Sequence, residues 1–173
     1  MPITDIEPVG TVLRTGTPAD TAKCLALWIE ACATRDGVAI AGVADRARPK
    51  FDHAETWIVA DSTDDGILGF VLATTPGSGL PGDPPDAPVV GLIAVAPRAQ
   101  GRGLGSDLMT AVADDLARAG HKRAVLHVLT DNHSAVRLYA GAGWRPLGAL
   151  FEHTLLKRPT QTYVLELPTA TEP

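Results

Sequence analysis

The sequence predicts a mixed α/β domain in which helices flank one sheet of parallel and antiparallel strands. Two apolar runs in the first half, rich in β-branched residues, flank the turn Asp64-Asp65-Gly66 as in an antiparallel hairpin. In the second half an apolar strand over 89–95 leads through glycines into an amphipathic helix, and another strand and helix follow. Two closing apolar runs indicate a last strand pair. This order of elements is typical of a mixed sheet.

Composition narrows the class of protein further. The chain has 173 residues, 45% of them hydrophobic, which suits a single domain over 1–173. Its net charge of -5 is dispersed, so there is no basic stripe for nucleic acid. Met1 to Asp5 lack the character of a signal peptide, and no apolar stretch reaches membrane-spanning length. We expect a cytoplasmic protein that binds neither nucleic acid nor membrane.

The two cysteines, Cys24 and Cys32, stand eight positions apart on one predicted helix. This spacing separates their Cα atoms by roughly 12 Å, beyond the reach of a disulfide. We therefore expect both thiols to be reduced. A metal site on these cysteines would lack further ligands, so no metal is predicted.

The first elements are a strand over 11–14 and a helix that starts at Thr17 to Asp20, a sequence with the residues of a capping box and an early proline. Gly37 is a fitting end for this helix. A second helix is expected over 38–48, because Pro49 would close it. The apolar residues that recur at helical spacing in the first helix are Leu25, Trp28, Ile29 and Cys32.

The predicted hairpin pairs residues 56–60 with 67–72. Residues 77–88 are so rich in glycine, proline and aspartate that they are predicted to form a loop, which can cover a binding site. Residues 89–95 are apolar on both faces, which places this strand centrally in the sheet.

The remaining elements alternate. A helix ends at Gly120, a strand covers 123–128, and a helix covers 132–142. Runs at 144–151 and 162–167 form the closing strand pair. The apolar stripe of the helix before Gly120 consists of Leu108, Met109, Val112 and Leu116.

Three alternate glycines, Gly101, Gly103 and Gly105, lie between the central strand and the amphipathic helix. Without side chains there, successive N–H groups can point into one concavity, and the helix that starts near Ser106 adds its own free N–H groups. Such a turn can cradle a pyrophosphate. Residues that can add counter-charge are Arg98 and Arg102.

The same glycines have a simpler interpretation, in which they only permit a tight strand-to-helix connection. Two other phosphate-binding motifs fit poorly. A dinucleotide fingerprint would need its third glycine where Ser106 stands, and no Gly-Lys-Ser/Thr follows the turn as in nucleotide hydrolases.

The segment Leu92 to Gly105 closely resembles the signature of GNAT acetyltransferases, in which (Arg/Gln)-x-x-Gly-x-(Gly/Ala) follows a Val-x-Pro strand end. Asn132-x-x-Ala-x-x-Leu-Tyr139-x-x-x-Gly-Trp144 resembles the second signature of the family. The resemblance centres on residues 89–145. It implies the acyl-CoA N-acyltransferase fold, with mostly antiparallel N-terminal strands, a splayed parallel central strand pair and about four flanking helices.

The resemblance also implies acetyl-CoA as cosubstrate. The backbone of 93–95 would bind the pantetheine arm where this strand splays from the one that carries Leu126, and 100–106 would hold the pyrophosphate. Asn132 would contact the arm near the thioester, although Asn is also a common helix N-cap. The implied cofactor-binding residues are Ile93, Ala94, Val95, Gln100, Gly101, Arg102, Gly103, Leu104, Gly105, Ser106 and Asn132.

Tyr139 matches the position at which many relatives carry a general acid for the departing thiolate. Full proton transfer from a phenol to a thiolate is uphill by about 2 kcal/mol from the ordinary pKa values of the two groups, so a hydrogen bond to the developing charge on sulfur is the safer description. The alternative is that Tyr139 is a core residue beside Leu138.

The attacking amine must be neutral, which costs a lysine-like amine about 4.6 kcal/mol at pH 7. Family members often carry a glutamate on the strand before the glycine turn, but 89–95 contains no carboxylate. The general base is therefore open, and each candidate has an alternative as a surface or packing residue. The candidates are Glu30, Asp52, His53, Glu55 and His127.

The resulting hypothesis is an N-acetyltransferase in which a bound amine attacks the thioester directly. Neither cysteine lies in the signature region, which argues against an acyl-cysteine intermediate. The expected acceptor is a small-molecule amine or a peptide amine, and a homodimer is expected from relatives. Two alternatives stay open: an acyl-CoA-binding sensor without catalysis, and an enzyme that acetylates protein lysines or N-termini.

Overall fold

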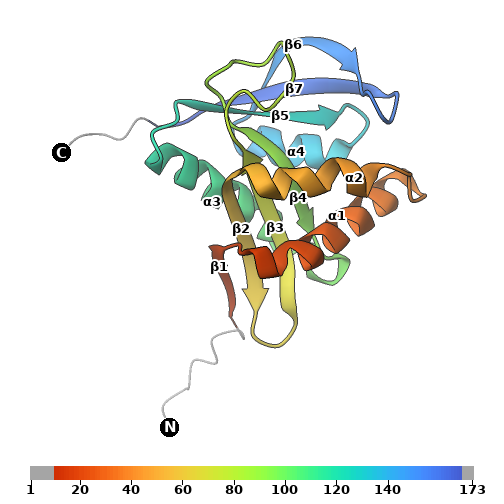
Figure 1. The fold of residues 1–173 in the computed structure, drawn as a ribbon, viewed down its shortest axis with the longest axis vertical. Coiled ribbons are helices and arrows are strands. Elements are labelled where there is room, and N and C mark those ends of the chain that lie inside the picture. Colours follow the sequence, from red (N-terminus) through yellow and green to blue (C-terminus); the bar gives the residue numbers. More distant parts are fainter. Residues whose placement is uncertain (1–9, 169–173) are drawn as a thin grey trace, which may run out of the picture.

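The computed structural model describes residues 10–168, in which seven strands form one mixed sheet in the order β1-β2-β3-β4-β5-β7-β6 (Figure 1). β4 and β5 are parallel, and all other neighbours are antiparallel. The strands are β1 (Thr11–Thr15), β2 (Ala54–Ser62), β3 (Gly66–Thr74), β4 (Val89–Val95), β5 (Arg123–Leu129), β6 (Arg145–Glu152) and β7 (Pro159–Glu166). The helices are α1 (Thr21–Asp36), α2 (Val43–Ala47), α3 (Leu104–Arg118) and α4 (His133–Gly141), with short 3₁₀ segments η1 (Pro18–Asp20), η2 (Arg48–His53) and η3 (Pro97–Ala99).

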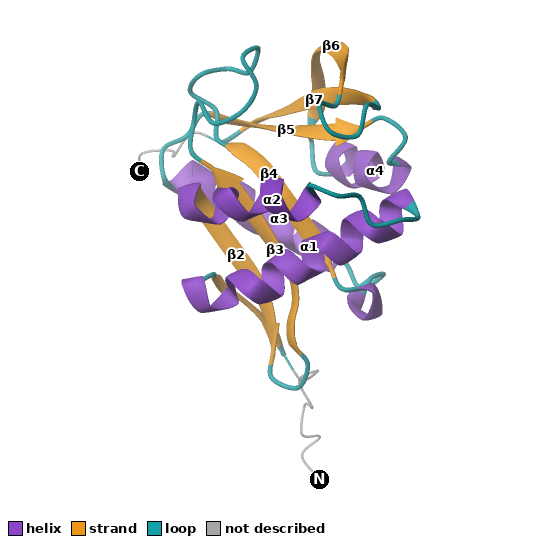
Figure 2. Cartoon of the chain, turned by 45° about the vertical axis from the view of Figure 1, so that its right-hand side comes forward, coloured by secondary structure: helices purple, strands orange, loops and turns teal. Residues whose placement is uncertain are grey.

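The helices cover both faces of the sheet (Figure 2). Alternate residues of β2 face opposite cores, as a strand requires: Ile58 packs with the apolar stripe of α3, and Val59 packs with α1 and α2. β4 stands in the middle of the strand order, which confirms its expected central place. The predicted mixed α/β fold is therefore confirmed.

The start of α1 follows the predicted capping residues. Thr17 and Asp20 form the capping box, and Gly37 ends the helix in the left-handed conformation with φ 75°. Arg14 of β1 donates to both carboxylate oxygens of Asp20, at 2.8 and 3.0 Å. These hydrogen bonds lower the pKa of Asp20 to about 2 and tie β1 to the helix start.

The expected second helix over 38–48 is wrong. Only α2 is α-helical in this region, because Gly42 takes a left-handed φ of 93° just before Val43 and so prevents helix from continuing back toward Gly37. Pro49 does not close a helix either. It occupies the first turn of η2, where its missing N–H costs nothing.

The predicted hairpin and closing strand pair are present; β2, β3 and β7 are longer than expected, and β6 is shifted by one residue. β7 lies between β5 and β6, so the last strand in sequence is not at the edge of the sheet. Residue His127 of β5 pairs with Thr162 of β7. The antiparallel pair formed by β5 and β7 brings the segment after β6 close to the central strands.

A β-bulge at Gly91 bends β4. Leu72 of β3 pairs with Leu92 and the next residue, Ala73, pairs with Val90, which leaves Gly91 as an extra residue. Val90 therefore faces α3, whereas Leu92 faces α1. Beyond this point β4 leaves β5, and the ladder between the two strands consists of one pair, Val89 with Val125.

Cys24 and Cys32 are buried free thiols, as predicted. Burial raises the pKa of Cys24 to about 12. Between residues 10 and 168, no helix combines the length and apolar character needed to cross a membrane. The Met1 to Asp5 segment used for the signal-peptide prediction lies outside the described residues.

Candidate active site

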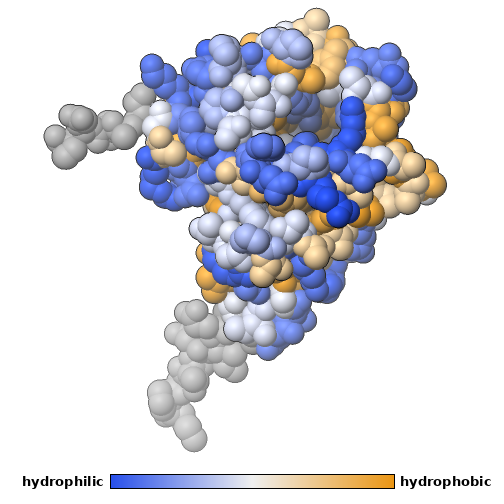
Figure 3. All heavy atoms as spheres, viewed as in Figure 1, coloured by the Kyte–Doolittle hydropathy of each residue, from blue (hydrophilic) through white to orange (hydrophobic). Residues whose placement is uncertain are grey.

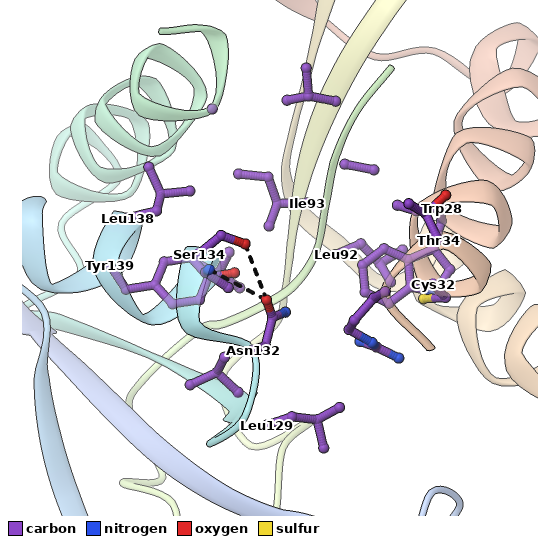
Figure 4. Close-up of a pocket in the computed structure, with 18 of the residues that line it drawn as sticks. Trp28, Cys32, Thr34, Leu92, Ile93, Leu129, Asn132, Ser134, Leu138 and Tyr139 are labelled. Carbon is purple, nitrogen blue, oxygen red and sulfur yellow. Dashed lines mark hydrogen bonds between the residues drawn. The ribbon is translucent and has the colours of Figure 1, made fainter. Parts of the chain in front are cut away.

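A cavity of about 1040 Å³ opens where β4 and β5 separate. Its walls come from β4, the glycine turn, the start of α4, the end of α1, α2 and the segment between β6 and β7. Figure 4 shows two opposite walls, with Asn132 and Tyr139 on one side and Trp28 and Cys32 on the other. Ile93 of β4 lies between them.

The glycine turn forms an open cradle at one end of this cavity. Gly101 and Gly103 have φ values of 80° and 79°, which side-chain-bearing residues rarely adopt. No atom lies within 4 Å of the place where either Cβ would stand. α3 begins at Leu104, so the N–H groups of its first turn have no partner within the helix. The turn therefore presents backbone donors to open space.

Gly105 has a different role from the other two glycines. It does not take a left-handed φ, and a Cβ added there would lie 3.5 Å from Leu138 of α4. That distance is an ordinary van der Waals contact, so neither backbone angle nor lack of space requires glycine here, and only Gly101 and Gly103 need the conformational freedom of glycine.

The structure brings almost all predicted cofactor-binding residues together. Every one of them lines the cavity except Arg102. Arg98 does not face the cradle as a free counter-charge, because its guanidinium donates to the Asp65 carbonyl at 3.1 Å. The side chain of Gln100 donates to the Val95 carbonyl at 3.3 Å and so ties the turn to the end of β4.

Asn132 is the N-cap of α4, the alternative role considered for it. Its Oδ1 accepts from the N–H of Ala135 at 3.4 Å and from the Ser134 hydroxyl at 3.4 Å (Figure 4). The residue also lines the cavity. Capping uses its oxygen, so the amide nitrogen is left for contacts within the cavity.

Tyr139 is both a core residue and a cavity residue. Its side chain is buried, and its ring centroid lies 6.5 Å from that of Trp144. Burial raises the pKa of Tyr139 to about 12. Within residues 10–168, two fully buried side-chain polar atoms lack a hydrogen-bond partner, the indole nitrogens of Trp57 and Trp144. The Tyr139 hydroxyl is not one of these buried, unpaired atoms. The hydroxyl thus reaches the cavity edge while the ring stays in the core.

Of the five candidate bases, His127 alone lines the cavity. Glu30, Asp52 and His53 are exposed outside it, and Glu55 pairs with His121. His127 projects from β5, and its Nε2 lies 2.9 Å from Oδ2 of Asp83. His127 is therefore the candidate base that a molecule in the cavity can reach.

Sequence reasoning missed Asp83 and the basic residues of the cavity wall. Asp83 lies in the 77–88 loop, 44 positions from His127, and only its place in the folded chain brings it to the histidine. The sequence offered one signal that could have pointed to Asp83, the expectation that the 77–88 loop can cover a binding site. The missed basic residues that line the cavity are Arg35, Arg46, Lys50 and Arg158.

Solved structures share this fold. The protein yncA from Salmonella typhimurium, solved with its cofactor acetyl-CoA, has a TM-score of 0.68 and 19% identity, over 95% of this chain and 98% of that one. Spermidine N-acetyltransferase from Vibrio cholerae, solved with CoA and spermine, has a TM-score of 0.66 and 18% identity, over 90% and 94%. The architecture is therefore that of the N-acetyltransferases.

The model of the Acetyltransferase (GNAT) family matches residues 25–144, which include the whole cradle, β5 and α4. The chain belongs to this family. The match confirms the resemblance seen in the two signature segments.

Named relatives cover the chain only in part. A mycothiol acetyltransferase from Nocardioides sp. is 36% identical over 57% of this chain and 35% of its own length. One from Mycobacterium sp. is 31% identical over 83% of this chain and 50% of its own length. This chain thus spans half or less of the length of these two relatives.

Proposed function

We propose that this protein transfers the acetyl group of acetyl-CoA to the amine of a small molecule. The observation that carries this proposal is the cradle at Gly101 and Gly103, which opens directly into the gap between β4 and β5. A Cβ at either glycine would occupy the space above the cradle, so the site fits a bulky anion held by backbone donors.

The proposed cofactor-binding residues divide by the chemistry they offer. The turn from Gln100 to Ser106, with Arg102 at its outer side, would hold the pyrophosphate through backbone N–H groups. Of the three strand residues, Ile93 and Val95 turn their polar backbone groups toward the gap left by β5 and would bind the amide-rich arm as a neighbouring strand does, whereas Ala94 turns its groups toward β3 and would only line the arm. Asn132 would hold the same arm from the opposite wall. When bound, acetyl-CoA supplies a thioester with an electrophilic carbonyl carbon.

The reaction needs one proton removed from the amine and a hydrogen bond that stabilises the departing thiolate. The amine nitrogen forms a bond to the carbonyl carbon, the carbon–sulfur bond breaks, and the sulfur leaves as thiolate. In neutral His127 a proton on Nε2 is held by Asp83, which leaves Nδ1 to accept the amine proton directly or through water. Tyr139 would donate a hydrogen bond to the sulfur. The remaining rate acceleration would come from holding the amine and the thioester close together in one cavity.

A small-molecule acceptor is supported by the names of the two relatives reported above, both mycothiol acetyltransferases, each of which this chain matches over half or less of its length. It is also supported by the way in which three separate elements, α1, α2 and the β6–β7 segment, line the acceptor side of the cavity. A cytoplasmic location, a homodimer and a single domain over 1–173 remain predictions.

The test is calorimetry with acetyl-CoA, followed by a thiol-release assay with amines and peptides. Binding and turnover of at least one small amine are expected. Absence of heat with acetyl-CoA contradicts the proposal. Binding without turnover of any acceptor indicates a sensor instead, and turnover of peptides alone indicates a protein acetyltransferase.

The same assay tests the base. His127→Gln is expected to lower turnover about 100-fold, the usual contribution of general base catalysis. His53→Gln, in an exposed histidine outside the cavity, is the matched control and should leave turnover unchanged. Equal effects of the two variants would remove His127 from the mechanism.

A further inference from the structure

The acceptor wall of the cavity is positively charged. Four basic side chains from α1, α2, η2 and the β6–β7 segment line it, and Asp131 is the one acidic side chain in the described lining. Figure 3 shows hydrophilic side chains gathered over α2 and the segment after it. The basic residues are Arg35, Arg46, Lys50 and Arg158.

Two of these four cations are neutralised within the protein. Asp36 accepts from Arg35 at 2.8 Å and from Arg158 at 2.6 Å, and Arg158 also binds Asp131 at 2.8 Å. These two arginines and two aspartates balance in charge, so this group is a structural brace for the wall.

The other two cations have no carboxylate partner among residues 10–168. Arg46 donates to the Thr154 hydroxyl at 2.5 Å and makes no salt bridge there. Lys50 is partly buried, and burial together with the charge of Arg46 lowers its pKa. A partly buried ammonium without a counter-charge is costly, which makes Lys50 a ready partner for an anion.

The positive charge of the wall also affects the pKa of His153. Its Nδ1 accepts from the N–H groups of Leu155 and Leu156, at 3.1 and 3.0 Å, which holds the ring in one orientation. Burial lowers its pKa first, and all four basic residues of the wall lower it further. The lowered pKa favours the neutral form of the ring, and no carboxylate within residues 10–168 forms a salt bridge with Arg46 or Lys50.

The position of Lys50 separates it from the cofactor cradle. A Cβ at Gly91 would lie 3.3 Å from its Nζ, so the ammonium lies against the bulge of β4. From Gly91 to Val95 the strand advances about 13 Å, and Gly101 lies beyond its end. Lys50 is therefore at the Gly91 end of the gap between β4 and β5, beside the strand residues that would bind the arm and far from the turn that would hold the pyrophosphate.

We infer that the acceptor is an amine that also carries an anionic group, a carboxylate or a phosphate, and that Lys50 and Arg46 bind this group. This inference rests on the proposed acetyltransferase function and adds the substrate class. The same positive wall disfavours the ammonium form of the acceptor, so it assists formation of the neutral amine. It also disfavours polyamines, whose several charges would meet these cations.

The experiment compares matched acceptors in the thiol-release assay: amino acids against their carboxamides, and aminoalkyl phosphates against the corresponding amino alcohols. The anionic member of at least one pair is expected to have a kcat/KM about tenfold higher or more, as for a charge-assisted contact. The two kinds of pair distinguish a carboxylate from a phosphate. Equal or lower kcat/KM for the anionic members of both kinds contradicts the inference.

Lys50→Met keeps the length of the side chain and removes the charge. It should reduce the preference for the anionic member about tenfold and leave the KM for acetyl-CoA unchanged. Arg46→Met should act in the same direction. The matched controls are Lys23→Met and Arg48→Met, two exposed positions outside the cavity, which should change neither value. A rise in the KM for acetyl-CoA with no change in preference overturns the inference.

Calorimetry with acetyl-CoA distinguishes an error in the acceptor class from an error in the proposed acetyltransferase function. No binding of acetyl-CoA contradicts the acetyltransferase itself, whereas binding of acetyl-CoA without any preference for anionic amines contradicts only the acceptor class. If no pair is turned over, binding of the same compounds to the complex with CoA gives the comparison. Tighter binding of the anionic member supports the inference, and equal or weaker binding contradicts it.

Discussion

Tyr139 has two ends in different surroundings. Its ring packs beside Trp144 in the core, and its hydroxyl reaches the cavity edge. Burial raises its pKa to about 12, so the phenol keeps its proton at neutral pH. A retained proton suits a donor to developing charge and excludes Tyr139 as a base in this range.

Tyr139→Phe should lower kcat about 100-fold with little effect on binding of acetyl-CoA, since the ring still fills the core. Because the folded-state pKa is raised, the proton is lost only as pH approaches 12, and the contribution of Tyr139 should persist at least to about pH 10. A pH series of turnover checks this. Tyr163→Phe, on β7 outside the cavity, is the control. Equal turnover of Tyr139→Phe and the parent protein at every pH would refute the donor role.

At this scale the sequence predicted the residues that lie within a motif and missed those that meet through the fold. Tyr139 and Asn132 belong to the second signature, and both line the cavity. Lys50 and Asp83 belong to no local pattern, because their partners are a bend in β4 and a histidine far along the chain. Spacing along a chain carries no information about such contacts.

The segment β4, turn and α3 is the element on which the site depends. The bulge at Gly91 turns the end of β4 away from β5, and the left-handed glycines after η3 return the chain into α3. Strand β4 has the bounds expected from its apolar run. The bulge was not predicted, because a single glycine in a strand does not reveal how the neighbouring strand pairs with it.

Gly101→Ala and Gly66→Ala form a matched pair. Each alanine would take a left-handed φ, of 80° and 71°, at a strain of about 1–2 kcal/mol, so both variants should lose similar stability in urea unfolding. Neither position has a neighbour within 4 Å of the new Cβ. Only Gly101→Ala intrudes on the cradle, and calorimetry should show its affinity for acetyl-CoA at least about tenfold lower. If Gly66→Ala weakens binding as much, strain alone explains the loss.

The helices show the limit of prediction for elements. α1 was predicted from its capping box and from Gly37, and both signals act through local hydrogen bonds and backbone angles. The helix over 38–48 was wrong because the turn at Gly42 was not recognised. The turn at Gly42 matters for the site, because the short α2 and η2 that follow it carry Arg46 and Lys50 to the cavity.

At the scale of the whole molecule, the sheet formed by residues 10–168 has two portions that meet at one residue pair, Val89 with Val125. β1 to β4 form one portion, and β5, β7 and β6 form the other. α3 packs on residues of both, so the core is continuous although the ladder is not. The mixed sheet was predictable from the order of elements, but the place of β7 between β5 and β6 was not.

This division predicts where a cofactor protects the backbone. Amides of β4 after Val89 that face β5 have no strand partner and should exchange their hydrogens quickly in the free protein. Acetyl-CoA should slow them about tenfold or more, together with the amides of Gly101 and Gly103. Hydrogen exchange measured by NMR checks this, with the paired amides of β2 and β3 as the internal reference. Protection confined to these reference strands would contradict the proposed binding mode.

The place of β7 between β5 and β6 also determines when the sheet can be completed during synthesis. Until residues 159–166 have left the ribosome, β5 has no antiparallel neighbour, and its contact with β4 is limited to one pair. A nascent chain that stops before β7 therefore displays an unpaired apolar strand, which invites association with other chains. The sheet is complete only with β7, the last described strand in the sequence, so any protection by chaperones is needed until that strand has emerged.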